Sequence, residues 1–444
     1  MRDIAVALVV FGLLPFVLKR PFWGILLLAW LGYMNPHRLC YGFMLSFPVV
    51  YVVALTTMIG MLVSKEAKRI VWSREMTVLV LLVVWMGLTT TQAMYSAEAW
   101  VQYQKVLKIQ LLTMMTLVML TSREKVHAFV WVIVLSLGFY GTKGGIFTIA
   151  KGGEQRVWGP EGTFIGGNNE LALALVMTIP LMRYLQLHSK RRLVRLGLGA
   201  AMFLSAVSAI GSQSRGALLA LSVMGLLFWL KGRRKLLIGV LTIAAAAVIL
   251  ALMPDAWYER MATIETYQDD ASAQGRINAW WTAWNLAKDR FMGGGFEVFK
   301  GPTFRIYAPN PEDVHDVHSI YFEMMGEHGF LGLALFLGLL WLAWLKCSTV
   351  IKMGRKDPSK AWAGDLAAMI QVSLAGFMVG GAFLGLAYFD YPYHLIALVV
   401  VTHALARGDP KSAGAPAPAA PPRPAPQRPA AASLPAPRLA RGPK

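Results

Sequence analysis

Long apolar stretches recur along the whole chain and are separated by short polar segments. Several approach the roughly 20 residues that a helix needs to cross a membrane, although the first two are short for that purpose. We therefore expect an all-α polytopic membrane protein with about 12 transmembrane helices. The candidate helices span residues 4–18, 22–34, 42–64, 75–93, 106–120, 127–149, 169–187, 195–212, 215–230, 235–253, 320–346, 364–388 and 393–406.

Lysine and arginine gather in the connections between these apolar stretches. The clusters lie within residues 65–74, 190–195, 231–235 and 352–360. Connections rich in Lys and Arg remain on the cytoplasmic side of a membrane. The pattern therefore predicts a cytoplasmic C-terminus and leaves the side of the N-terminus open. The segments expected on the opposite side are 94–105, 150–168, the turn at 211–216, 254–319 and the turn near 389–392.

The same pattern divides the chain into four parts. We expect N-terminal transmembrane helices in 1–253, a large outer loop in 254–319, C-terminal transmembrane helices in 320–406 and a cytoplasmic tail in 407–444. The outer loop carries short amphipathic patterns rich in Trp, suited either to a helix at the membrane surface or to a small packed cap. The tail is rich in Pro and Ala and is predicted to be disordered.

The composition agrees with a membrane protein and excludes several other classes. Of the 444 residues, 56% are hydrophobic and 15% are charged, and the mean hydropathy is +0.51. The net charge of +19 is spread over short connections and no soluble basic domain accompanies it, so we predict contact with membrane lipids and not with nucleic acid. The two cysteines, Cys40 and Cys347, are too isolated to indicate a disulfide framework or a CxxC site.

Three ionisable residues next to apolar stretches are candidates for chemistry. Arg215 follows the polar turn 211–214, Arg276 lies within the outer loop, and His318 stands where that loop returns to the membrane. An ionisable side chain near the membrane is costly, so its presence points to a function. Arg215 alone is also compatible with an arginine that extends to the membrane interface.

The predicted topology brings these residues to one side. The helices beginning near Arg215 and His318 both run inward, so both positive N-terminal ends face outward. Ser212 or Ser214 is suited to cap the first helix and Asp316 the second. Helix N-termini combined with arginine side chains favour an anion such as pyrophosphate. In the first turn of its helix, His318 is expected to be neutral and able to accept a proton.

Two further patterns suggest alternatives. His315 and His318 form an HxxH pair, which could bind a metal if it lay on a helix, but few carboxylates accompany it, and we predict no metal site. The glycine-rich stretch 159–169 resembles a phosphate-binding loop but lacks the lysine of a P-loop. We expect a flexible outer loop there that contacts substrate at most.

Three motifs in order resemble the signature of the O-antigen ligase and polymerase superfamily, over about residues 165–345. They are Ser-x-Ser-Arg-Gly-Ala at 212–217, Gly-Arg-x-x-x-Trp at 275–280 followed by Gly-Gly-Gly-Phe at 293–296, and His-Ser-x-Tyr-x-Glu-x-x-x-Glu-x-Gly at 318–329. The segment Tyr33–Arg38 is similar to a subgroup of O-glycosylation ligases associated with exosortase systems.

This resemblance implies a GT-C-type glycosyltransferase of the bacterial inner membrane, with its active site on the periplasmic face and with neither metal nor cofactor. The implied donor is a glycan on undecaprenyl pyrophosphate, and the implied acceptor is a sugar hydroxyl of the lipid A core. Arg215 and Arg276 would bind the pyrophosphate, and His318 would act as the general base. The further candidates for substrate binding are Gln213, Tyr321, His315 and Trp280, of which Tyr321 and Trp280 are better suited to core packing than to stacking on a sugar.

Related reactions remain open at this point. A glycan polymerase would use the same donor with a second lipid-linked chain as acceptor, and a protein O-glycosylation ligase would transfer the glycan to Ser or Thr. A transporter is disfavoured because the candidate residues gather on one side, whereas transport needs polar groups through the membrane depth.

Overall fold

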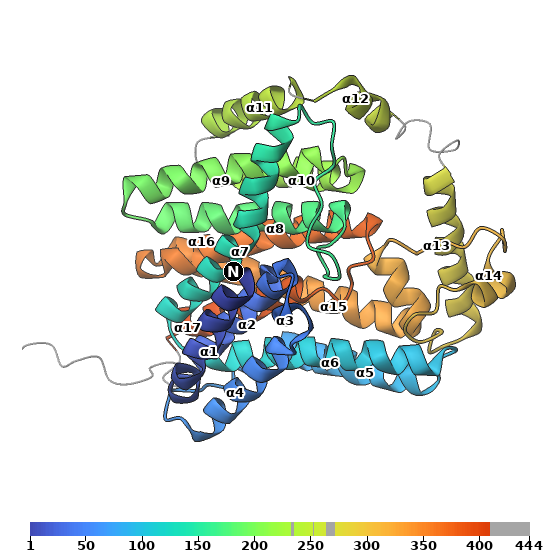
Figure 1. Ribbon diagram of the computed structural model, residues 1–444, viewed down its shortest axis with the longest axis horizontal. Helices are drawn as coiled ribbons and strands as arrows, with labels where there is room; N and C mark the ends of the chain where they lie inside the picture. Colours follow the sequence, from blue (N-terminus) through green and yellow to red (C-terminus); the bar gives the residue numbers. More distant parts are fainter. Residues whose placement is uncertain (232–234, 252, 263–270, 409–444) are drawn as a thin grey trace, which may run out of the picture.

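The computed structural model describes residues 1–231, 235–251, 253–262 and 271–408, and this part of the chain is helical without strands (Figure 1). The all-α prediction is therefore confirmed. The α-helices are α1 (Arg2–Lys19), α2 (Phe22–Tyr33), α3 (Phe43–Ser46), α4 (Val49–Val63), α5 (Arg74–Thr91), α6 (Ser96–Met119), α7 (Arg123–Ala150), α8 (Asn168–His188), α9 (Arg192–Gly211), α10 (Arg215–Lys231), α11 (Lys235–Ala251), α12 (Asp255–Ala262), α13 (Ala271–Asp289), α14 (Gly301–Tyr307), α15 (Ile320–Lys356), α16 (Ala361–Gly380) and α17 (Asp390–Ala406). Three short 3₁₀ helices are η1 (Pro36–Leu39), η2 (Pro358–Lys360) and η3 (Gly381–Phe383).

Six of the described helical stretches are long and apolar enough to cross a membrane. They are α5, α7, α8, α9, α15 and the stretch Pro358–Phe383 that contains α16. The apolar helices α2 and α4 are shorter. The chain is thus a multi-pass membrane protein, as the apolar pattern predicts.

Four predicted helices have wrong bounds, and one of them, 320–346, is ten residues too short because α15 ends at Lys356. The predicted helix 42–64 is divided into α3 and α4 at Pro48, because the residue before a proline avoids helical geometry. Helix α6 begins at Ser96 and not at residue 106, so most of the predicted outer segment 94–105 is helical. The predicted helix 364–388 ends at Gly380, and η3 and an extended stretch follow it. The predicted disordered tail lies outside the described residues beyond Gly408.

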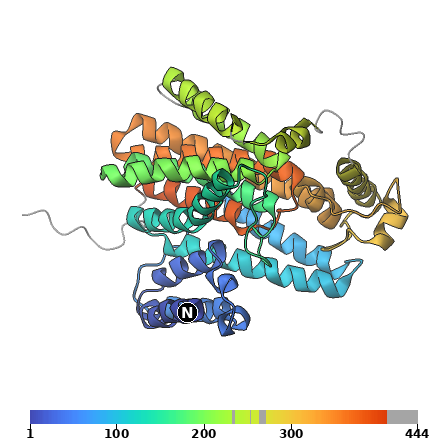
Figure 2. The same cartoon turned by 45° about the horizontal axis from the view of Figure 1, so that its top comes forward.

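Helices α8, α16 and α17 form the centre of the bundle. Most of their side chains are buried, on all sides of the helix and not on one face. A helix that is apolar all round belongs inside a bundle. Helices α1–α4 lie together on one side of this centre, as Figures 1 and 2 show, and share a small apolar cluster of their own.

The packing of α7 against α9 is close because small residues face each other. A methyl group added at Gly145 of α7 would lie 2.3 Å from the carbonyl oxygen of Leu204 on α9. Gly141 and Gly144 face Ser205 and Ser208 in the same way. Small residues allow such approach between membrane helices. The contact fixes the C-terminal end of α9, which leads directly into the polar turn before Arg215.

Helix α15 is kinked at Gly329, the last residue of the third motif. The kink explains how the Gly-Gly-Gly-Phe motif at 293–296 is held in place. Gly329 has φ 67° and ψ −174°, a conformation open essentially only to glycine. The interruption releases carbonyl groups of the preceding turn. The backbone N–H groups of Gly294 and Gly295 donate to the carbonyl oxygens of Gly326 and Glu327, each at 2.9 Å. The loop 293–295 is therefore anchored to α15.

We expect Gly329→Ala to lower the free energy of unfolding by about 2–5 kcal/mol, because its methyl group would be strained and would lie 2.1 Å from the carbonyl oxygen of Phe291. Gly338 provides a matched control on the same helix, since nothing lies within 4 Å of an added methyl group. Gly338→Ala should change stability by at most about 1 kcal/mol. Thermal unfolding in detergent measures both variants. Equal melting temperatures for the two would contradict the strain argument.

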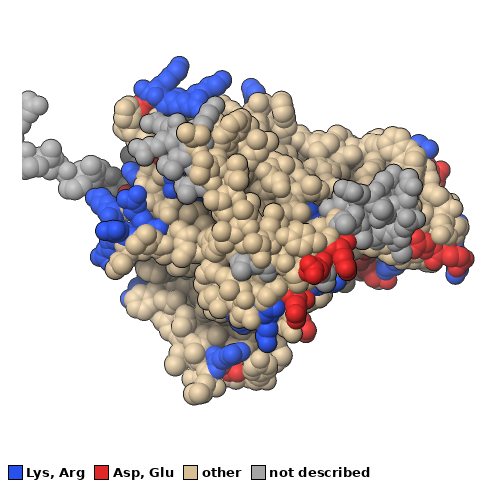
Figure 3. All heavy atoms as spheres, turned by 90° about the horizontal axis from the view of Figure 1, so that it is seen from above, with Lys and Arg blue, Asp and Glu red and all other residues tan. Residues whose placement is uncertain are grey.

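Charged side chains separate along the long axis of the molecule. Figure 3 shows Lys and Arg concentrated at one end of the visible face and most Asp and Glu toward the other. The basic connections meet at one end: His188, at the end of α8, lies 3.1 Å from Asp365 near the start of α16. Likewise Lys125 of α7 lies 2.9 Å from Glu66, between α4 and α5. Helices α13 and α14 lie at the opposite end (Figure 1).

Candidate functional site

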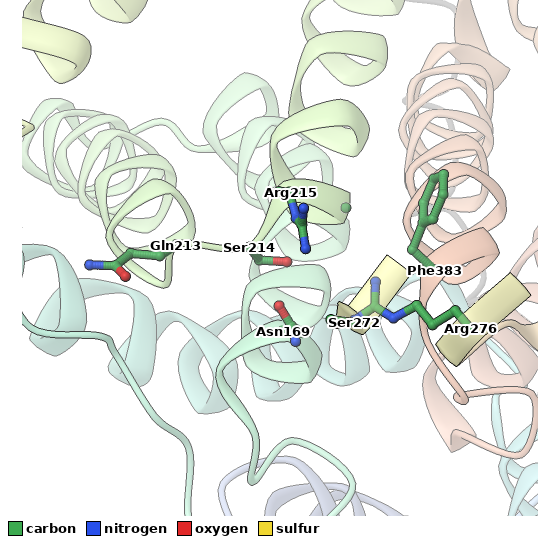
Figure 4. A pocket seen from close by; sticks show the side chains of 8 residues that line it. Asn169, Gln213, Ser214, Arg215, Ser272, Arg276 and Phe383 are labelled. Carbon is green, nitrogen blue, oxygen red and sulfur yellow. The ribbon is translucent and has the colours of Figure 1, made fainter. Parts of the chain in front are cut away.

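A polar pocket lies at the end of the bundle that carries α13, and two arginines from separate helices contribute to it. Arg215 is the first residue of α10 and Arg276 belongs to α13. Figure 4 shows both side chains directed toward the same space. The structure thus brings together two residues that are 61 positions apart in the sequence. The lining residues are Asn169, Gln213, Ser214, Arg215, Gly216, Ser272, Arg276 and Phe383.

The N-termini of α8 and α10 converge on this pocket, together with the first described turn of α13. Asn169 is the second residue of α8, Arg215 the first of α10 and Ser272 the second of α13. The Ser214 hydroxyl accepts a hydrogen bond from the backbone N–H of Ala217 at 3.2 Å, so Ser214 caps α10 as predicted. Ser212 instead donates to the carbonyl oxygen of Ala209. The partial positive charges of the helix ends add to the two guanidinium groups and favour an anionic group in the pocket.

Gln213 shapes the turn before Arg215. It adopts the left-handed conformation with φ 59°, and Figure 4 shows its amide extending away from Arg215. The amide oxygen accepts from Nε of Arg156 at 3.2 Å, and the amide nitrogen donates to the carbonyl oxygens of Gly153 and Glu154. Gln213 thus connects the outer loop 151–167 to the pocket. Its predicted contact with substrate stays a prediction.

His318 lies just before α15, which corrects two expectations. The helix begins at Ile320, so His318 is not in its first turn, and its φ of 40° is left-handed. The N-cap position belongs to Ser319, and Asp316 does not cap the helix. Instead, the Asp316 carboxylate lies 3.5 Å from Nδ1 of His318. The imidazole is one-third exposed, so it remains accessible to a substrate.

Trp280 connects the His318 segment to the pocket. Its indole N–H donates to the carbonyl oxygen of Val317 at 2.9 Å, and its ring stacks on Phe322 with centroids 5.0 Å apart. Its ring also lies 6.5 Å from that of Phe383, which lines the pocket. These contacts are packing contacts. The Tyr321 hydroxyl likewise donates to the carbonyl oxygen of Met378 at 2.7 Å, and a role of either residue in sugar binding stays a prediction.

His315 packs beside the second motif. Its ring covers Gly275, where an added methyl group would lie 2.4 Å from Nδ1 of His315. Gly275 precedes Arg276, so His315 stands next to one of the two arginines of the pocket. The segment 308–319 is not helical, and the HxxH pair therefore lacks the shared helix face that a metal pair would need. Within the described residues, no three His, Cys, Asp or Glu side chains are placed to hold a metal ion.

A buried polar network behind the site escaped the sequence analysis. The Tyr388 hydroxyl donates to Glu327 and lies 2.9 Å from Nε2 of His328, whose Nδ1 lies 2.7 Å from the Thr89 hydroxyl. Glu327 also accepts from the backbone N–H of Glu297 at 2.8 Å. Glu327, the second Glu of the third motif, therefore holds α15 to the 293–297 loop. Thr89 of α5 and Tyr388 of the 384–389 stretch belong to the same hydrogen-bond network.

The N-terminal motif contacts the outer loop and not the pocket. Asn35 is left-handed with φ 48°, and the Tyr140 hydroxyl donates to the carbonyl oxygen of Met34 at 2.5 Å. Arg38 lies against Gly162 of the outer loop. Burial, with Arg38 beside it, holds the pKa of His37 below its ordinary value. The motif supports the loop that Gln213 anchors from the other side.

Comparison with known families divides the chain in two. Residues 1–190 match a family described as "Family of unknown function (DUF5935)", and residues 200–337 match a family described as "O-Antigen ligase". The second match includes Arg215, Arg276 and His318 with their three motifs. No curated protein matches the chain.

Proposed function

Since residues 200–337 place this chain in the O-antigen ligase and polymerase superfamily, we propose that it transfers a glycan from undecaprenyl pyrophosphate to a sugar hydroxyl of the lipid A core. The observation that carries the proposal is the pair Arg215 and Arg276 at a pocket where the N-termini of α8 and α10 converge. Such a pocket is suited to a diphosphate, the group common to lipid-linked glycan donors.

The proposed reaction is a single displacement at the anomeric carbon of the donor sugar. The bond from that carbon to the pyrophosphate oxygen breaks, and a bond to the acceptor oxygen forms. Undecaprenyl pyrophosphate leaves with the electron pair, and the proton of the acceptor hydroxyl passes to His318. Arg215 and Arg276 stabilise the charge that develops on the departing diphosphate, and such stabilisation is usually the largest contribution to catalysis.

The proposal includes a location. The pocket lies at the end of the bundle that carries α13, opposite the basic connection between α8 and α9 (Figure 1). Connections rich in Lys and Arg remain in the cytoplasm. The site then faces the periplasm across a bacterial inner membrane, and the C-terminus faces the cytoplasm. The proposed enzyme is a GT-C-type transferase, in which a helix bundle would admit a lipid-linked donor from the membrane.

Reconstitution tests the proposal directly. The purified full chain in liposomes receives an undecaprenyl-pyrophosphate glycan and lipid A core, and mass spectrometry measures sugar gained by the core. Transfer to the core supports the ligase. Elongation of the lipid-linked glycan instead would identify a polymerase, and glycan on an added exported protein would identify a protein O-glycosylation ligase. No transfer to any of the three would overturn the proposed function.

We also expect the transfer rate to be unaffected by a chelator, because the arginines supply the positive charge that a divalent ion supplies in other transferases. The measurement is the same assay with and without excess EDTA, after metal-free purification. A loss of activity that a divalent ion restores would show that the reaction needs a metal.

A further inference from the structure

The sequence Asp-Val-His occurs twice in tandem at the edge of the site, at 313–315 and at 316–318. In each copy the histidine faces the aspartate two residues before it. Nδ1 of His315 lies 2.7 Å from Asp313, and Nδ1 of His318 lies 3.5 Å from Asp316. The first pair stands beside Gly275 and the donor pocket, so the second pair is the one available to an acceptor.

We propose that Asp316 is a positioning residue that orients His318 for proton transfer, an inference that rests on the proposed function. A carboxylate facing Nδ1 favours the tautomer that carries its proton on Nδ1. That tautomer leaves the lone pair on Nε2 to accept the proton of the acceptor hydroxyl. The arrangement follows the general rule that a base is oriented by a third group.

The oxygen of Asp316 that faces the imidazole, Oδ2, also lies beside Gly385. An added methyl group at Gly385 would lie 3.6 Å from Oδ2 of Asp316 and 3.7 Å from Oε1 of Glu323, so the two carboxylates approach each other across this glycine. Glu323 is held in place because Oε2 accepts the backbone N–H of Ala387 at 3.0 Å.

The backbone fixes the other partner. His318 holds a left-handed conformation that non-glycine residues adopt uncommonly. The residue before it is held through the hydrogen bond from Trp280 to the carbonyl oxygen of Val317. The backbone at His318 therefore has a defined position, and Asp316 is the described partner of its ring.

Kinetics of Asp316→Asn test the proposal. We expect kcat to fall about tenfold or more, a part of the 10²–10⁴-fold contribution of a general base, with the KM for the donor unchanged. In a His318→Ala background, Asp316→Asn should cause no further loss, because it acts through His318. Glu312→Gln removes a charge from the same exposed segment and should leave kcat unchanged. Full kcat in Asp316→Asn would overturn the proposal.

A second measurement does not depend on transfer. Diethylpyrocarbonate modifies neutral imidazole nitrogens, and mass spectrometry follows the rate at His318. Asp316→Asn should slow this modification several-fold while Glu312→Gln leaves it unchanged. An equal rate in all three proteins would refute orientation by Asp316. If the wild type transfers no glycan while the modification of His318 still depends on Asp316, then the proposed function fails and the positioning role survives.

Discussion

Replacing Arg276 with alanine should lower the rate constant of glycan transfer by about 10²–10³-fold, and Arg215→Ala should have an effect of similar size. The diphosphate gains negative charge as its bond to the sugar breaks. Each guanidinium group is aimed at the pocket from a different helix, so each stabilises that charge from its own side. The loss should appear mainly in kcat, because the interaction strengthens in the transition state.

Lysine variants separate charge from geometry. Arg215→Lys and Arg276→Lys retain a positive charge and lose the planar fork that binds two phosphate oxygens at once. We expect them to fall between the wild type and the alanine variants. The double alanine variant should lose less than the product of the two single losses, because both side chains act on one leaving group.

Arg305 provides the control for these variants. It is an exposed arginine on α14, at the same end of the molecule, and it does not line the pocket. Arg305→Ala should transfer glycan at the wild-type rate. The diphosphate assignment would be untenable if Arg305→Ala were as slow as the pocket variants, or if both pocket variants kept full activity while folded in detergent.

Much of this arrangement could be predicted from residues close together in the sequence. The start of α10 was predicted at residue 215 and lies there, because Ser214 supplies a cap immediately before an apolar stretch. The amphipathic pattern in 271–290 likewise matches α13. Both signals are local, and the placement of basic connections then indicates that the two arginines share one side of the membrane.

The conformation around His318 could not be predicted in this way. A helix beginning with a capping aspartate is the ordinary expectation from Asp316, whereas Ser319 takes the N-cap position and His318 turns left-handed. The segment contacts residues far from it in the sequence: Trp280 donates to the carbonyl oxygen of Val317, and Asp316 lies beside Gly385. Contacts of this kind depend on the packed fold and leave no local pattern.

The glycine-rich motif at 293–296 shows the same limit. Its structural role depends on the kink at Gly329, because the carbonyl groups that the kink releases in α15 accept hydrogen bonds from Gly294 and Gly295. The hydrogen-bond network of Thr89, His328 and Tyr388 could not be predicted from the sequence either, since its members come from three segments far apart in the chain. The motif residues of the family thus include structural members beside the candidate catalytic ones.

His318→Ala should reduce glycan transfer by about 10²–10⁴-fold, the range over which general bases contribute, while the protein remains folded. The imidazole is partly exposed and packs into no apolar core cluster, so its loss removes chemistry without opening a cavity. The expected result is a fall in kcat at unchanged melting temperature. Reconstituted transfer and thermal unfolding of the same preparation measure the two quantities.

A variant of the neighbouring His315 tests whether His318 acts as the base or whether any change in this segment slows transfer. His315→Ala removes a ring of the same kind, three residues earlier, that packs on Gly275 beside the donor pocket. It should raise the KM for the donor and leave kcat within about tenfold of the wild type, because it stabilises binding and accepts no proton. If His315→Ala lost the larger share of kcat and His318→Ala remained active, the base would be His315, and the acceptor would have to approach over the first Asp-Val-His copy instead of the second.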